Sequence, residues 1–130
     1  MHKKFLALAA ISGGLAVVLG AFGAHSLERI TNDEKILHGF QTGVQYQMFH
    51  SLALLAVALL YDKLPLAPVK WAGNCFIIGI IFFSGSLYLL TIFKIQGSPA
   101  VKYAGPITPL GGVLFIAGWV CLLIAAIKKK

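Results

Sequence analysis

The amino-acid sequence predicts an all-α integral membrane protein, an antiparallel four-helix bundle with both termini cytoplasmic. Of its 130 residues 58% are hydrophobic and only 12% are charged, and the mean hydropathy is +0.86. A soluble domain of this length cannot bury so much apolar surface. Four segments, at about 5–24, 44–61, 71–93 and 104–127, contain no Asp, Glu, Lys or Arg. Each is close to the ~20 residues that cross a bilayer as a helix, so we predict a single transmembrane domain, 1–130.

The distribution of basic residues predicts the orientation. The links between the four segments are short, which is the situation in which Lys and Arg stay on the cytoplasmic side. One side carries seven such residues: Lys3, Lys4, Lys63, Lys70, Lys128, Lys129 and Lys130. The other side carries four: Arg29, Lys35, Lys94 and Lys102. Because the richer side includes both chain ends, we expect both termini in the cytoplasm.

The first segment has two readings. Its basic start, apolar stretch and Ala21-Phe22-Gly23 resemble a cleavable secretory signal. The stretch is long for a signal, however, and Ser12, Ala16, Gly20 and Ala24 place a small residue at every fourth position. Such a face lets one membrane helix approach another closely. We therefore interpret the segment as a retained transmembrane helix.

Uncharged polar residues cluster at one end of the predicted bundle. The second segment begins with Gln45, Gln47 and His50 before becoming apolar, and residues 33–43 before it predict an interfacial helix that leads into the span. Unpaired polar groups in lipid cost several kcal/mol, so these side chains are expected to share partners in the outer half of the membrane. The candidate ligand-binding residues are His25, Gln45, Gln47, His50, Ser84, Ser86 and Thr108.

The residue patterns argue against several classes of function. The basic residues are scattered at segment ends rather than gathered on one face, so no nucleic-acid partner is predicted. No nucleophile with an adjacent base, phosphate loop or pair of membrane acids occurs, which argues against an enzyme. Haem or metal ligation by His25 and His50 is the less favoured reading, because neither has a cysteine or carboxylate beside it. No cofactor or metal site is predicted. Cys75 and Cys121 are expected to be buried thiols.

Four motifs resemble one known family. They are GAFGAH at 20–25, TGVQYQMFH at 42–50, FSGSLY at 83–88 and ITPLGG at 107–112. In this order they resemble the family of the domain of unknown function 423, small four-helix proteins of the bacterial inner membrane that are similar to the animal transmembrane protein 256. The resemblance implies a multi-pass protein of the cytoplasmic membrane. It implies no reaction, substrate or cofactor.

Two functional hypotheses follow. The first is a non-catalytic protein whose outer polar pocket binds a lipid, a quinone-like molecule or a partner helix, and which supports envelope integrity or the assembly of a complex. Small-residue faces also predict a homo-oligomer. The alternative is a component of a transporter or channel for a small solute or protons. The inner half of the spans offers few polar residues, which favours binding over passage.

Overall fold

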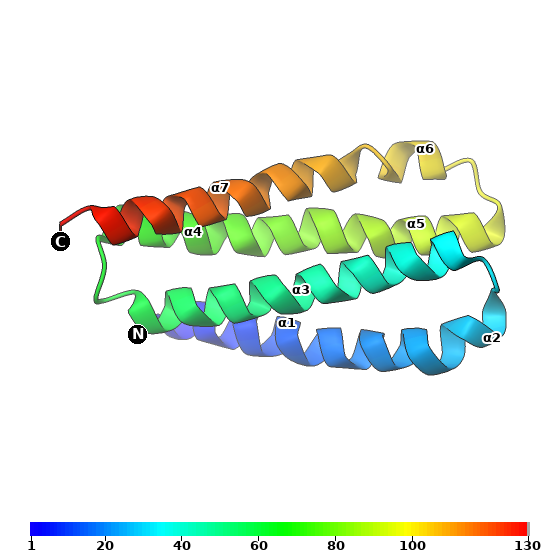
Figure 1. Cartoon of the computed structure of the whole chain (residues 1–130), viewed down its shortest axis with the longest axis horizontal. Helices are drawn as coiled ribbons and strands as arrows, with labels where there is room; N and C mark the ends of the chain where they lie inside the picture. The colour runs from blue at the N-terminus through cyan, green and yellow to red at the C-terminus, as the bar shows by residue number, and fades with distance from the viewer. Residues whose placement is uncertain (130) are drawn as a thin grey trace.

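The chain folds into four long antiparallel helical rods that carry both termini at the same end (Figure 1). The computed structural model describes residues 1–129. The first rod consists of α1 (Lys3–Phe22), η1 (Gly23–Leu27) and α2 (Glu28–Ile30), and the second of α3 (Glu34–Leu60). The third consists of α4 (Leu66–Gly79), η2 (Ile80–Ser84) and α5 (Gly85–Gln96), and the fourth of α6 (Val101–Ala104) and α7 (Ile107–Ile127). We call the end opposite the termini the distal end.

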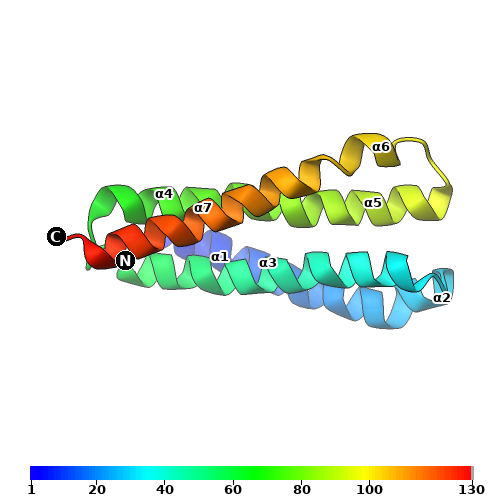
Figure 2. The same cartoon turned by 45° about the horizontal axis from the view of Figure 1, so that its top comes forward.

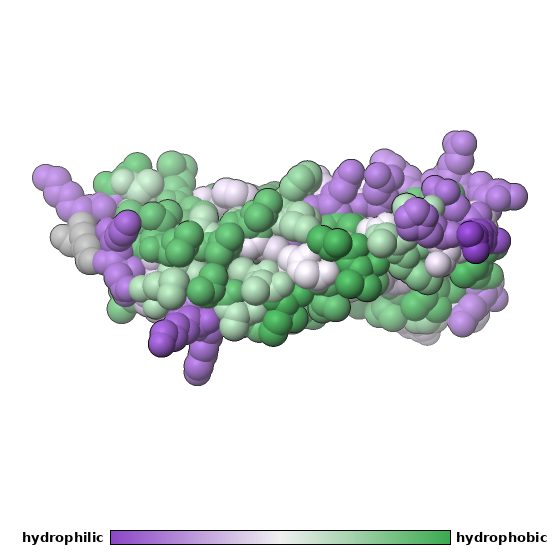
Figure 3. Space-filling model, turned by 90° about the horizontal axis from the view of Figure 1, so that it is seen from below, coloured by the Kyte–Doolittle hydropathy of each residue, from purple (hydrophilic) through white to green (hydrophobic). Residues whose placement is uncertain are grey.

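All four rods are long and apolar enough to cross a membrane. On the face shown in Figure 3, hydrophobic atoms cover most of the middle of the molecule and hydrophilic atoms gather toward its two ends. Exposed Leu, Ile, Val and Phe side chains lie along every rod, as is required where hydrocarbon rather than water is the solvent. The predicted all-α membrane bundle is thereby confirmed.

The link predicted between the first two spans is mostly helical. Residues 25–43 contain η1, α2 and the first turns of α3, so that only Thr31, Asn32 and Asp33 lie outside a helix. The Asp33 carboxylate accepts a hydrogen bond from the Lys35 backbone N–H at 2.9 Å and so caps α3. Ile36 and Phe40 are buried beyond this cap. The expected interfacial helix and the second span are therefore one continuous helix.

The bundle consists of two hairpins joined mainly through α3. In the first hairpin α1 packs along α3, and in the second α7 packs along α4 and η2. Contacts between the hairpins run from α3 to α4, η2 and α5, and Figure 2 shows α7 crossing the third rod obliquely. The backbones of α1 and the third rod, and those of α3 and α7, approach each other at few points, and an opening lies on each of these two flanks.

The first rod is an integral part of the first hairpin. Ala16 is only 1% exposed, and a Cβ placed on Gly20 would lie 3.4 Å from Val44 on α3. At the end that carries the termini, the His2 backbone N–H donates to the Ala58 carbonyl at 3.0 Å. The Met1 ammonium pairs with Asp62. The small-residue face thus packs against α3 as a membrane helix does.

Candidate functional site

Gln47 connects three of the rods at the middle of α3. Its side-chain amide donates to the Ser12 carbonyl at 2.8 Å, and its oxygen accepts from the Tyr88 hydroxyl at 2.6 Å. The Ser51 hydroxyl, one turn further along α3, donates to Ser12 Oγ at 2.7 Å. Gln47 is only 4% exposed, and both its side-chain nitrogen and its side-chain oxygen have a partner on another rod. Ser12, Ser51 and Tyr88 were not predicted as its partners.

His50 is held as a neutral imidazole. Trp119 on α7 donates its indole N–H to His50 Nε2 at 3.1 Å. Because Trp can only donate, Nε2 carries a lone pair, and Nδ1 therefore carries the proton that it donates to the Tyr46 carbonyl at 2.8 Å. Phe115 lies parallel to the imidazole, with ring centres 3.6 Å apart and an interplanar angle of 8°. Both ring nitrogens are thus used in packing rather than presented to a metal.

The predicted serines and threonine form two further links between helices. Ser84 on η2 donates to the Gly43 carbonyl at 2.7 Å, and Ser86 on α5 shares a hydrogen bond with Thr108 at the start of α7. Within residues 1–129 no buried side-chain nitrogen or oxygen lacks a hydrogen-bond partner. The predicted polar residues thus take part in several links that join one helix to another. These links extend to the middle of the rods instead of remaining near the distal end.

Two of the seven predicted site residues lie apart from these links. His25 is exposed on η1, and Gln45 is exposed on α3. The reason is rotational, because Gln45 and Gln47 are about 200° apart around a helix that advances 100° per residue. Gln47 therefore faces the bundle while Gln45 faces outward. Among the described residues there is no group of three or more His, Cys, Asp and Glu residues able to hold a metal.

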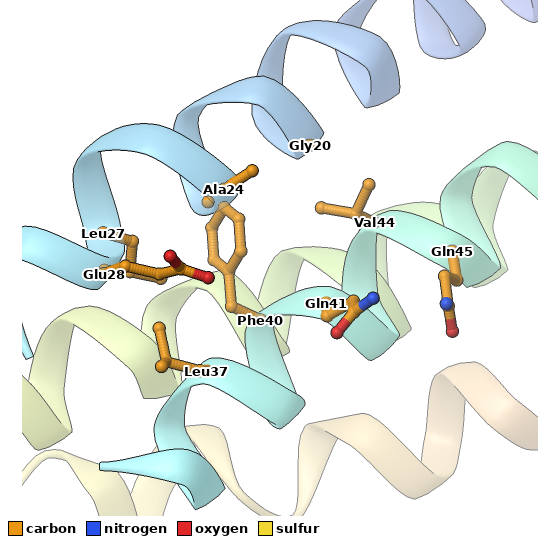
Figure 4. A pocket seen from close by; sticks show the side chains of 10 residues that line it. Gly20, Ala24, Leu27, Glu28, Leu37, Phe40, Gln41, Val44 and Gln45 are labelled. Carbon is orange, nitrogen blue, oxygen red and sulfur yellow. The ribbon is translucent and has the colours of Figure 1, made fainter. Parts of the chain in front are cut away.

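A cavity of about 250 Å³ lies between the first rod and α3 at the distal end (Figure 4). Its walls combine apolar residues with a carboxylate and two amides, and they consist of Gly20, Gly23, Ala24, Leu27, Glu28, Leu37, Phe40, Gln41, Val44 and Gln45. Figure 4 shows Glu28 extending toward the Phe40 ring, with Gln41 and Gln45 on neighbouring turns of α3. We call it the distal cavity. Only Gln45 among the predicted site residues lines it.

The wider helical turn η1 shapes this cavity. Gly23, Ala24 and Leu27 lie in η1 and line the distal cavity. A Cβ on Gly23 would lie 2.8 Å from Phe40 Cε1, so glycine permits η1 to approach the ring. Single π-helical turns occur frequently at functional sites. This turn was not predicted from the sequence.

Comparison with known proteins shows the family to which the chain belongs. The profile of the family described as "Protein of unknown function (DUF423)" matches residues 19–112. The chain belongs to the DUF423 family. It is 49% identical to the UPF0382 membrane protein YwdK of Bacillus subtilis, over 97% of this chain and 98% of that one. It is 43% identical to a UPF0382 membrane protein of Haemophilus influenzae, over 100% and 98%.

The family also includes a eukaryotic member. A UPF0382 membrane protein of Schizosaccharomyces pombe is 38% identical over 90% of this chain and 96% of its own. No solved structure matches the chain. The resemblance read from the four motifs is confirmed, and the region matched by the DUF423 profile contains every residue that lines the distal cavity.

In this DUF423 chain the distal cavity has the chemistry of an amphipathic site. The Glu28, Gln41 and Gln45 side chains make no hydrogen bond to any residue in the described part of the chain. They supply a negative charge, two amide donors and two amide acceptors beside the Phe40 ring. Ligand pockets for drug-sized molecules span about 300–1,000 Å³, so a volume of about 250 Å³ accommodates a headgroup whose tail remains in the bilayer.

Proposed function

We propose that the protein is a non-catalytic, multi-pass protein of the bacterial cytoplasmic membrane that binds the headgroup of a membrane lipid in the distal cavity. Through this lipid it would support envelope integrity or the assembly of a larger complex. One observation carries the proposal: the distal cavity places Glu28, Gln41 and Gln45 on an otherwise apolar wall at one end of the spans. Such a wall suits a molecule that is polar at one end and apolar at the other.

The lining favours a headgroup that carries an amine. Glu28 supplies a carboxylate and the Phe40 ring a π face, and both attract an ammonium group. The amides of Gln41 and Gln45 can donate to phosphate or ester oxygens of the same headgroup. A phospholipid with a primary amine, such as phosphatidylethanolamine, contains all of these groups. We therefore infer that an amine phospholipid is the ligand.

A role in transport is less well supported. The interior polar side chains link one helix to another in pairs, as Gln47 does with Tyr88 and Ser84 with the Gly43 carbonyl. Paired groups of this kind stabilise the packing of membrane helices. The distal cavity lies between only two rods and at one end of them. This arrangement supports a binding site more than a path across the membrane.

Native mass spectrometry of protein in nanodiscs containing phosphatidylethanolamine and phosphatidylglycerol tests the proposal. We expect the wild-type protein to retain phosphatidylethanolamine in preference to phosphatidylglycerol. Glu28→Gln removes the carboxylate charge and Ala24→Leu fills the cavity, so both variants should lose the preference. The control is Ala21→Leu, the same change at an exposed position of α1 outside the cavity lining.

Equal retention of the two lipids by the wild type would contradict the proposal, as would an unchanged preference in both Glu28→Gln and Ala24→Leu. The same spectra report the number of subunits and therefore test the predicted homo-oligomer. A melting temperature for each variant confirms that the protein remains folded. A flux assay in proteoliposomes tests the transport alternative, for which we expect no solute or proton leak above that of empty vesicles.

A further inference from the structure

A second opening lies on the opposite side of α3, between α3 and α7. It has a volume of about 470 Å³, within the usual range for a small-molecule pocket. Its lining includes Tyr46, His50, Phe115 and Trp119, together with Pro109 and Gly112 on α7. The distal cavity, in contrast, lies between the first rod and α3. We call the second opening the aromatic groove.

The rings of the aromatic groove support one another. Tyr46 stacks on Phe83 with ring centres 4.8 Å apart and an interplanar angle of 25°. The Trp119 and His50 rings meet edge to face with ring centres 5.9 Å apart, and the indole N–H of Trp119 donates to the His50 imidazole. The groove therefore presents aromatic surfaces whose positions are set by packing, and such surfaces favour a planar ring over a flexible chain.

Gly112 leaves room between these rings. A Cβ on Gly112 would meet only the ring of Phe83, at 3.9 Å, which is an ordinary van der Waals contact. Larger side chains at this position would extend into the groove without disturbing a neighbouring backbone. The neighbouring Gly111 differs, because a Cβ there would overlap the Phe83 backbone. Gly112 is thus a point at which the groove can be filled selectively.

The Tyr46 hydroxyl lacks a partner within the described chain. Tyr46 is 40% exposed and lies near the middle of α3, and none of the described residues accepts a hydrogen bond from its hydroxyl or donates one to it. A hydroxyl at this depth faces hydrocarbon, where an unmade hydrogen bond costs several kcal/mol. The two polar groups beside it, on His50 and Trp119, are already engaged with each other. A ligand with an acceptor oxygen would therefore find one donor, on Tyr46.

We propose that the aromatic groove binds a lipid-soluble molecule whose planar ring carries a carbonyl oxygen, as a quinone does. The ring lies against the aromatic side chains over Gly112, and its carbonyl accepts the hydrogen bond of the Tyr46 hydroxyl. Its hydrocarbon tail remains in the bilayer, to which the groove opens. A saturated acyl chain fits this surface less well, because it offers no acceptor to Tyr46. The site is independent of the proposed lipid headgroup site.

Tryptophan fluorescence provides a direct test, because quinones quench indole emission on contact. The chain contains two tryptophans, Trp71 and Trp119. In a Trp71→Phe protein the signal comes from Trp119 in the groove, whereas Trp119→Phe leaves Trp71, which is 64% exposed on α4. Titration in nanodiscs with a benzoquinone that carries a ten-carbon tail should quench Trp119 with a saturable curve. Trp71 should show only the linear decrease of random collisions.

Variants in the Trp71→Phe background assign the effect to the groove. Tyr46→Phe removes only the hydroxyl, and we expect it to weaken binding about three- to tenfold, the effect of losing one hydrogen bond. Gly112→Leu should abolish saturation. Gly14→Leu is its matched control, because a Cβ on Gly14 meets nothing within 4 Å and Gly14 lines neither opening. We expect Gly14→Leu to bind as its parent does.

Several results would overturn the proposal. Linear quenching of Trp119 is one, and identical curves for Gly112→Leu and Gly14→Leu are another. Competition by a ten-carbon alkane as strong as that by the quinone would identify the groove as an acyl-chain site instead. Glu28 lies outside the aromatic groove, so Glu28→Gln should leave the quinone titration unchanged. Failure of the distal cavity to bind lipid is seen in the lipid-retention experiment, and failure of the groove to bind the ring is seen in the Trp119 titration.

Discussion

At the scale of single residues, the polar side chains inside the spans are paired with partners on other rods. Gln47 uses its donor toward Ser12 on α1 and its acceptor toward Tyr88 on α5. In hydrocarbon the loss of one partner leaves the other with no water to replace it. Pairing of this kind therefore determines which rods lie side by side as well as how tightly they pack.

We predict that Gln47 and Tyr88 are energetically coupled. Gln47→Leu leaves the Tyr88 hydroxyl and the Ser12 carbonyl without this partner and should destabilise the protein by about 1–3 kcal/mol. Tyr88→Phe removes the other half of the pair. The double variant should be less destabilised than the sum of the two single changes, by about 0.6–1.7 kcal/mol. Unfolding of all four proteins in mixed micelles measures this difference. Strictly additive effects would show that the bond contributes nothing.

At the scale of elements, glycines on one helix receive aromatic rings from the next. A Cβ on Gly79 would meet Phe115, and one on Gly118 would meet Phe76, each at 2.5 Å. These contacts lie along the interface between the third rod and α7. Close approach of this kind gives van der Waals packing a large role, because lipid offers helices little hydrophobic driving force to associate.

Neighbouring glycines on α7 should respond differently to alanine. A Cβ at Gly111 would overlap the backbone of Phe83 in η2, whereas a Cβ at Gly112 would only touch the Phe83 ring. We expect Gly111→Ala to destabilise the protein by about 1–3 kcal/mol, because the two helices must move apart. Gly112→Ala should be neutral or slightly stabilising, since alanine favours the helix. Thermal unfolding of both variants measures this difference in stability. Equal melting temperatures would contradict the observed packing.

At the scale of the whole molecule, the four antiparallel rods place both termini at one end (Figure 1). The same end carries Lys63 and Lys70 around the link from α3 to α4. The distal end carries the distal cavity and fewer basic residues. If the richer end lies in the cytoplasm, the distal cavity opens near the outer leaflet of the membrane.

Reporter fusions test this orientation. We predict that a fluorescent protein fused after the last residue is bright and that alkaline phosphatase fused there is inactive, because both would lie in the cytoplasm. Phosphatase fused after Gly97, at the distal end between α5 and α6, should be active. Gly97 follows α5 with a φ of 64° and lies outside any helix, so this fusion point interrupts no rod. Active phosphatase at the C-terminus would reverse the topology and place the distal cavity on the cytoplasmic side.

The sequence by itself determined the class of the protein, the number of its rods and their alternating direction. Hydropathy is a property of about 20 consecutive residues, and short links force neighbouring spans to run antiparallel. The motifs also determined the family. Paired polar groups were expected in the interior because lipid leaves them no other partner, and five of the seven candidate residues, Gln47, His50, Ser84, Ser86 and Thr108, make such links.

Only the tertiary structure decided which groups pair and where the openings lie. Ser12, Tyr88 and Trp119 are distant in sequence from Gln47 and His50, and their contacts depend on how far each helix is rotated about its axis. A hydropathy pattern constrains that rotation poorly in a chain that is apolar on nearly all sides. The turns η1 and η2 were likewise not predicted from the sequence. The distal cavity and the aromatic groove form between packed rods, because space between helices is a property of the pair and not of either segment.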